Sequence, residues 1–126
     1  MNKYQAVQAF WSGFGWAAFN EGTVPDDALE LNNNRYITYE SITDKIGNAI
    51  FTHATLWHRS TSWTTIHAKA AEIAEHVETV MPPSLPVDNG RLVIRMAAPY
   101  AQDMPDEDRT LRKVFLNVQL EFLTNS

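Results

Sequence analysis

The sequence has no cysteine, no long apolar run and few basic residues. Without cysteine there is no disulfide framework, no thiolate metal site and no thiol nucleophile, so the chain must fold by packing alone. No segment approaches the ~20 consecutive apolar residues of a membrane-spanning helix. Polar residues such as Gln5, Gln8 and Ser12 interrupt the early apolar residues before a signal-peptide core can form. We therefore expect neither membrane association nor export by the usual route.

The scarcity of basic residues bears on nucleic-acid binding. Ten Lys and Arg stand against 15 Asp and Glu, which gives a net charge of −5. The densest basic group, at residues 109, 112 and 113, directly follows an acidic stretch at 103–108. This balance disfavours a general phosphate-binding surface, and we expect no sequence-specific nucleic-acid binding. An acidic surface would instead suit a channel through which DNA slides.

The chain is long enough to bury a core as one domain, residues 1–126, and two of its segments have helical periodicity. Apolar residues recur at three- and four-residue steps over residues 2–19 and again over 63–80, where Ser62 is the expected N-cap. Gly13 and Gly15 each cost about 1 kcal/mol in a helix interior, so we expect the first helix either to end early or to pack closely against another element. Its aromatic residues exceed what one stripe can bury, and we expect some of them to face a neighbour.

Four segments have the character of β-strands. They are rich in β-branched and aromatic residues, and the last one alternates strictly between apolar and polar positions. Asp88-Asn89-Gly90 is a turn signal that opens the third strand. We expect a polar connection at 20–34 and an acidic loop at 99–110. The strands are predicted at 35–42, 50–59, 91–98 and 112–123.

These elements predict an α/β (α+β) fold in which two helices pack on one face of a sheet of about four strands, in the order α-β-β-α-β-β. The expected core includes Ile73 and Val77 of the second helix and Leu116 and Leu120 of the last strand. Three large aromatic side chains, by contrast, fall on sheet positions outside the main aliphatic face. These residues, Phe51, Trp57 and Phe115, are the candidates for an oligomer interface.

The histidines are the first candidates for metal or acid–base chemistry. His53 and His58 are five residues apart in a predicted strand and must point to opposite faces. His67 and His76 are half a turn out of phase on a helix. Glu72 and His76 fall at i, i+4, the spacing of an ordinary surface pair. The histidines therefore predict no metal centre.

Two other clusters invite a chemical interpretation. Asp103, Asp106, Glu107 and Asp108 could attract a hard cation, but the ligand spacing and the glycine of a calcium loop are missing. Hydroxyl residues crowd the segment 55–65 near two histidines, yet no nucleophile elbow and no orienting acid accompany them. We therefore predict no catalytic residues, no cofactor and no metal, and we expect that the chain is not an enzyme.

The arrangement of these segments nevertheless resembles a known family. The aromatic first helix (YQAVQAFWSGFGW), the Pro-Asp-Asp connection at 25–27, the strand YITYE and the segment LWHRSTSW before an alanine-rich helix are similar to small tail proteins of long-tailed bacteriophages. The stretches 90–102 and 114–123 fit the same family, so the resemblance spans nearly the whole chain. The family comprises tail-terminator, tail-completion and minor tail proteins.

The resemblance implies a structural protein that forms a homo-oligomeric ring, usually of six subunits. The ring would cap the tail tube and join it to the head connector, after assembly in the host cytoplasm and within the virion tail. A neck or minor tail protein of similar fold is the alternative. Two other classes remain open: a small host-directed binding module, and a free-standing enzyme, which loss of an activity in a His58→Ala variant would reveal.

Overall fold

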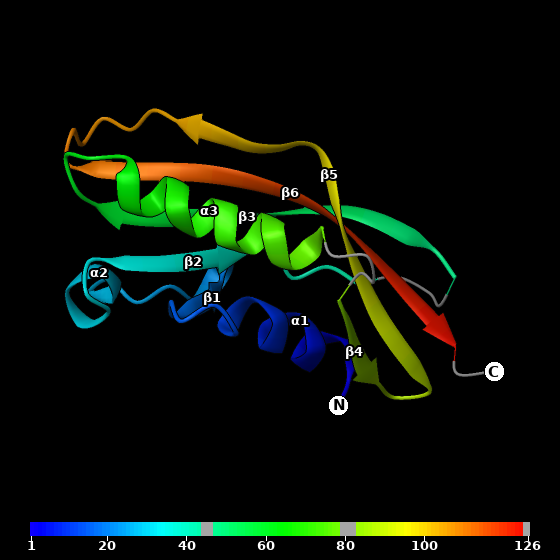
Figure 1. Cartoon of the computed structure of the whole chain (residues 1–126). Helices are drawn as coiled ribbons and strands as arrows, with labels where there is room; N and C mark the ends of the chain where they lie inside the picture. Colours follow the sequence, from blue (N-terminus) through cyan, green and yellow to red (C-terminus); the bar gives the residue numbers. More distant parts are fainter. Residues whose placement is uncertain (44–46, 79–82, 125–126) are drawn as a thin grey trace.

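The computed structural model describes residues 1–43, 47–78 and 83–124 and has strands as its main elements. The three longest strands, β3, β6 and β5, lie side by side, and β5 and β6 form a hairpin. One long helix, α3, runs along the sheet (Figure 1). In chain order the elements are α1 (Lys3–Ser12), β1 (Ala18–Asn20), the 3-10 turn η1 (Glu21–Thr23), α2 (Ala28–Leu31), β2 (Arg35–Tyr39), β3 (Ala49–Arg59), α3 (Thr64–Val77), β4 (Ser84–Val87), β5 (Gly90–Met104) and β6 (Leu111–Thr124).

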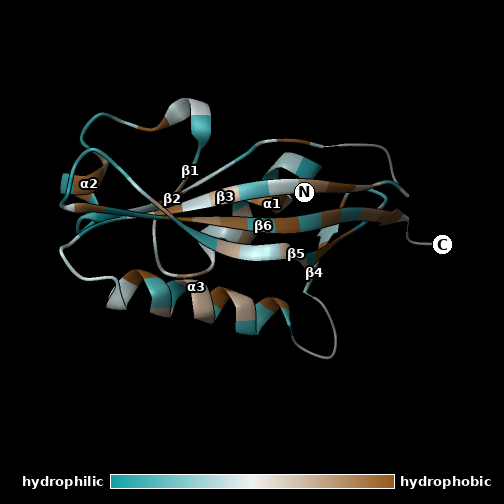
Figure 2. Cartoon of the chain, turned by 90° about the horizontal axis from the view of Figure 1, so that it is seen from above, coloured by the Kyte–Doolittle hydropathy of each residue, from teal (hydrophilic) through white to brown (hydrophobic). Residues whose placement is uncertain are grey.

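The sheet has six strands in the order β1-β2-β3-β6-β5-β4. β1 runs parallel to β2, and all other neighbours are antiparallel. The sheet curls, so that α1 contacts both of its edge strands, β1 and β4. α3 instead lies along β3, β5 and β6, on one side of the sheet (Figure 2).

The prediction of about four strands with two helices packed on one face is therefore wrong. The structure is a curled, mixed sheet of six strands, and α1 bridges its two edges. Sequence periodicity missed β1 and β4 because strands of three and four residues are too short to show alternation. Pro86 in β4 also argued against a strand, although a sheet edge tolerates proline.

The first helix ends at Ser12, well before the predicted residue 19. It begins with a capping box, in which the Asn2 side chain accepts from the Gln5 N–H at 2.8 Å and the Gln5 side chain accepts from the Asn2 N–H at 2.8 Å. Gly13 caps its other end, and Gly15 has a φ of +81°, which turns the chain toward β1. Phe14 and Trp16 are buried although they lie in the loop after the helix, which explains why the apolar pattern continued past Ser12.

The second predicted helix is present as α3, at Thr64–Val77; residues 79 and 80 lie outside the described residues. Its N-cap is Trp63 rather than Ser62, although the Ser62 hydroxyl accepts from the Thr64 N–H at 3.1 Å. The four residues chosen as core are all buried, with exposed fractions of 4% or less. They belong to one cluster that joins α1, α3 and the inner face of the sheet.

The acidic segment 99–110 is a loop only from residue 105 onward. β5 continues to Met104, and a register shift between Met96 and Ala101 lets it pass Pro99 while still pairing with β6. The predicted turn at 88–90 is confirmed, since Val87 pairs with Gly90 and Asn89 has a φ of +66°. Proline and acidic residues made the end of this strand resemble a loop.

Candidate interaction surface

The three predicted interface residues lie on the same face of the sheet, opposite the core. Phe51 and Trp57 are both on β3, six residues apart, and Phe115 of β6 pairs with Thr55 between them. Residues at even spacing along a strand share a face. We call this surface, defined by Phe51, Trp57 and Phe115, the outer face.

Phe51 is the most exposed large apolar residue of the outer face. Its side chain is 72% exposed, opposite Gln119 of β6. Its neighbours farther across the sheet are polar, and Arg95 pairs with Glu121 at 3.1 Å. An exposed large aromatic ring among polar side chains is a typical anchor for a protein partner.

Trp57 is half-buried by other side chains of the same chain. Its indole Nε1 donates to the Thr38 hydroxyl at 2.9 Å, and its ring stacks on Tyr36 with 5.8 Å between centroids. The Lys113 ammonium lies 5.2 Å from the ring centroid, within the range of a cation–π contact. Trp57 therefore presents only part of its ring to a partner.

Phe115 is also partly covered, by His53. The two rings stack at 4.8 Å, and the imidazole Nε2 lies 2.6 Å from Oε1 of Glu21 in η1. The Glu40 carboxylate is 3.8 Å from the other imidazole nitrogen. These contacts fasten η1 over the outer face and leave Phe51 as its best-exposed aromatic residue.

The remaining candidate residues are placed mainly in ion pairs. His67 lies 2.9 Å from Asp103, Lys113 3.0 Å from Asp106, and Arg59 4.0 Å from Asp108. Backbone and Lys113 hydrogen bonds lower the pKa of Asp106, and hydrogen bonds from Thr110 lower that of Asp108. Among the described residues, no group of three His, Asp or Glu side chains is arranged to hold a metal ion. The acidic segment is thus tied to other parts of the same chain.

His58 points to the opposite face from His53, as their spacing predicts. It packs against Trp16 with 6.0 Å between ring centroids and pairs with Arg35 of β2 across the sheet. Its Nδ1 is buried and has no hydrogen-bond partner in the described structure. Burial, and then the positive charge of Arg35, lower the pKa of the His58 side chain. His58 is therefore a half-buried histidine that packs beside the core, with only its Nδ1 atom fully buried.

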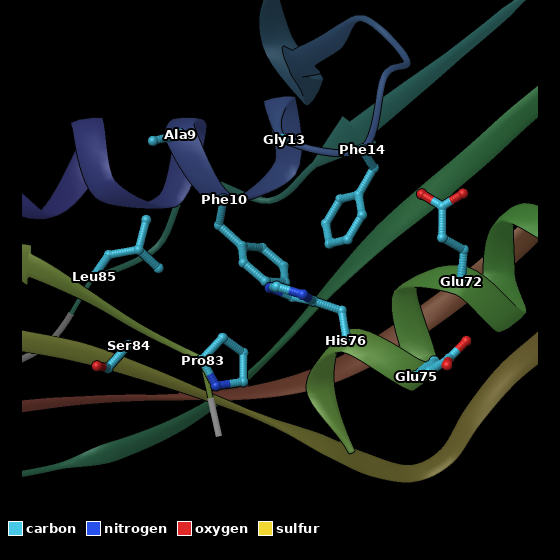
Figure 3. Close-up of a pocket in the computed structure, with 10 residues that line it drawn as sticks. All are labelled: Ala9, Phe10, Gly13, Phe14, Glu72, Glu75, His76, Pro83, Ser84 and Leu85. Atoms are coloured by element: carbon cyan, nitrogen blue, oxygen red, sulfur yellow. The ribbon is translucent and has the colours of Figure 1, made fainter. Parts of the chain in front are cut away.

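Sequence reasoning missed a groove of about 710 Å³ between α1, α3 and the start of β4 (Figure 3). Phe10, Phe14 and His76 point into it, with the His76 ring edge-on to Phe14 at 5.5 Å. Glu72 and Glu75 of α3 also line it. The aromatic excess of the first helix was the available signal, since it indicated side chains that face a neighbour.

Within the part of the chain that the structure describes, no helix is long and apolar enough to cross a membrane.

No family model and no curated protein matches the chain. A solved structure does: a chain described as "Virion of native gene transfer agent (GTA) particle", with a TM-score of 0.62 and 18% sequence identity. The alignment covers 94% of this chain and 90% of that one. At this identity the likeness shows a shared fold over essentially the whole length of both chains.

Proposed function

We propose that the chain is a structural component of a phage-like particle. The likeness to a chain of a gene transfer agent virion supports this, because it extends over 94% of this chain and 90% of that one. The sequence resemblance to small tail proteins points in the same direction. A structural role also agrees with the ion pairs that engage His67, Arg95 and Lys113 with carboxylates of the same chain.

Within that class we propose a tail terminator that forms a ring of six copies. The observation that supports assembly is the 72% exposure of Phe51 on the outer face, and the terminator role and the six copies follow the resemblance to small phage tail proteins. A neighbouring subunit would cover the outer face, in an interface of about 2,000 Å² or more. The tail tube protein and the head connector would be the partners, with assembly in the host cytoplasm and the ring retained in the virion tail.

The charge of the chain also supports a ring around a channel. A net charge of −5 would keep the wall from binding the DNA backbone, and DNA could then pass without being held. A neck or minor tail protein of similar fold would share this property. The two roles differ in the partner, because only a terminator acts on the end of a growing tube.

The decisive experiment combines mass and tube length. Light scattering should give a multiple of the 14.3 kDa subunit, with six copies expected, and negative-stain images should show closed rings. Added to the tube protein encoded with this chain, the protein should cap and shorten the polymerising tubes. Rings that leave tube length unchanged would favour a neck protein. A monomer at high concentration that also ignores tube ends would overturn the proposal.

A matched pair of variants tests the surface. Phe51 and Leu31 are similarly exposed, at 72% and 71%, but Leu31 lies in α2 and not on the strands β3 and β6 that carry the outer face. Phe51→Ser should shift the mass toward the monomer, because a central aromatic residue can supply about 2 kcal/mol or more of association energy. Leu31→Ser should assemble like the parent. Equal effects of the two substitutions would place the interface elsewhere.

A further inference from the structure

The groove between α1, α3 and β4 is a second surface with its own chemistry. Its floor is apolar and aromatic, formed by Phe10 and Phe14 of the α1 segment and by Leu85 of β4 (Figure 3). Phe10 and Phe14 pack edge-to-face at 5.3 Å, which fixes both rings. A volume of about 710 Å³ lies within the range of sites that enclose a ligand or a few residues of a peptide.

The rim of the groove is acidic. Glu72 and Glu75 both lie on the exposed side of α3. Glu72 forms an ion pair with Lys69, with 3.0 Å between Oε1 and Nζ. Within the described residues, no ion pair compensates Glu75. An occupant that places an apolar group on the floor would therefore gain by bringing a positive charge to this rim.

The third wall is β4, the edge strand of the sheet that α1 contacts. The Ile94 N–H donates to the Pro83 carbonyl at 3.1 Å. Leu85 and Val87 lie two and four residues after Pro83, so their main-chain groups also face β5. In an antiparallel pair, alternate residues direct their main-chain groups away from the partner strand. Ser84, which lines the groove, therefore turns its N–H and C=O away from β5. An extended chain could bind these groups as well as the floor.

We propose that this groove binds an extended peptide segment of another protein, in which an apolar side chain stands next to a lysine or arginine. The apolar side chain lies between Phe10, Phe14 and Leu85, and the cation lies against Glu75. The main chain of the segment bonds to Ser84. This interaction is separate from the ring contacts on the outer face and does not require them.

A peptide library on the intact protein tests the proposal. Random heptapeptides displayed on filamentous phage are selected on the immobilised chain, and the enriched sequences are synthesised with capped ends and measured by fluorescence anisotropy. The enriched peptides should combine a Leu, Ile, Met or Phe with an adjacent Lys or Arg. Selection of no such sequence, or of acidic sequences, would overturn the proposal.

Two variants locate the site. Ala9 is exposed and lines the groove, so Ala9→Trp should block it and abolish binding. Glu75→Lys should weaken binding about tenfold, because it reverses the charge that faces the peptide cation. Circular dichroism checks that both variants fold. Peptides that bind both variants as tightly as the parent would show that the groove is not their site.

The control variants separate this proposal from ring assembly and from net charge. Glu107→Lys makes the same charge change as Glu75→Lys on an exposed residue of the loop at 105–110, and should leave peptide affinity unchanged. Phe51→Ser should disrupt the ring and still bind the peptides. Loss of binding in Glu107→Lys equal to that in Glu75→Lys would reduce the effect to general electrostatics and overturn the groove assignment.

Discussion

The indole N–H of Trp57 donates to the Thr38 hydroxyl at 2.9 Å, from β3 to the neighbouring strand β2. This bond and the stacked Tyr36 ring hold the Trp57 side chain against the neighbouring strand of the same chain. Phe51, on the same strand and the same face, has 72% of its surface exposed. Two aromatic residues that the sequence pattern treats alike therefore have different physical roles, and this difference can be measured.

Substituting each residue with glutamate should separate those roles. Trp57→Glu should lower the free energy of unfolding by about 1 to 3 kcal/mol, because it removes the ring stack and the hydrogen bond. Phe51→Glu should change it by no more than about 0.5 kcal/mol, since the side chain is at the surface, while still weakening assembly. Urea unfolding at a low protein concentration, where the subunits are dissociated, measures both. A larger loss in Phe51→Glu than in Trp57→Glu would contradict the described packing.

The core should respond to truncation as buried aliphatic residues do. Ile73, Leu116 and Leu120 are each 0% exposed, so replacing any one with alanine should cost about 2 to 5 kcal/mol. Val77→Ala should cost less, because valine has fewer atoms to lose. Glu107→Ala, at the surface, serves as the control. Urea midpoints for Ile73→Ala and Leu116→Ala equal to that of the parent would show that the inner faces are wrongly assigned.

The long, regular elements were predictable because their periodicity extends over several turns or residue pairs. This periodicity predicted the buried positions of α3 and the alternation along β6, and the residue types at 88–90 predicted the turn before Gly90. The curvature of the sheet could not be predicted in this way. Whether α1 packs on a flat face or bridges two sheet edges depends on contacts between residues near positions 10 and 85, which no local pattern reports.

The candidate sites show the same limit. That Phe51, Trp57 and Phe115 share a face followed from the spacing along β3 and the apolar exception on β6. That His53 covers Phe115 while Phe51 stays exposed depends on η1, a three-residue turn within a segment expected to be a polar connection. The groove joins three elements far apart in the sequence, and only the folded chain brings them together.

Gly90 should tolerate no side chain. A Cβ at this position would lie 1.9 Å from the carbonyl oxygen of Leu123 on β6, so the backbone would have to shift. Gly90→Ala should cost about 1 to 3 kcal/mol or more. Gly22→Ala is the matched control, because its Cβ would meet only the Asn20 side chain at 3.8 Å. Its stability should be unchanged or raised by about 0.4 to 1 kcal/mol. Equal urea midpoints for the two variants would contradict the close approach of the β5 and β6 backbones.

The last prediction concerns pH. The folded-state pKa of His58 lies below the unfolded value of about 6.5, because burial and the charge of Arg35 disfavour the imidazolium. The unfolded state therefore binds more protons between the two pKa values, and stability rises with pH in that window. The contribution of His58 is fully present above about pH 6.5 and is lost as the pH falls through the folded pKa.

Urea midpoints between pH 8 and 5 should decline more steeply for the parent than for His58→Gln, which cannot be protonated. His67→Gln removes a surface imidazole that faces Asp103 and is the control for the loss of any histidine. Parallel curves for the parent and His58→Gln would show that folding leaves the pKa of His58 unchanged.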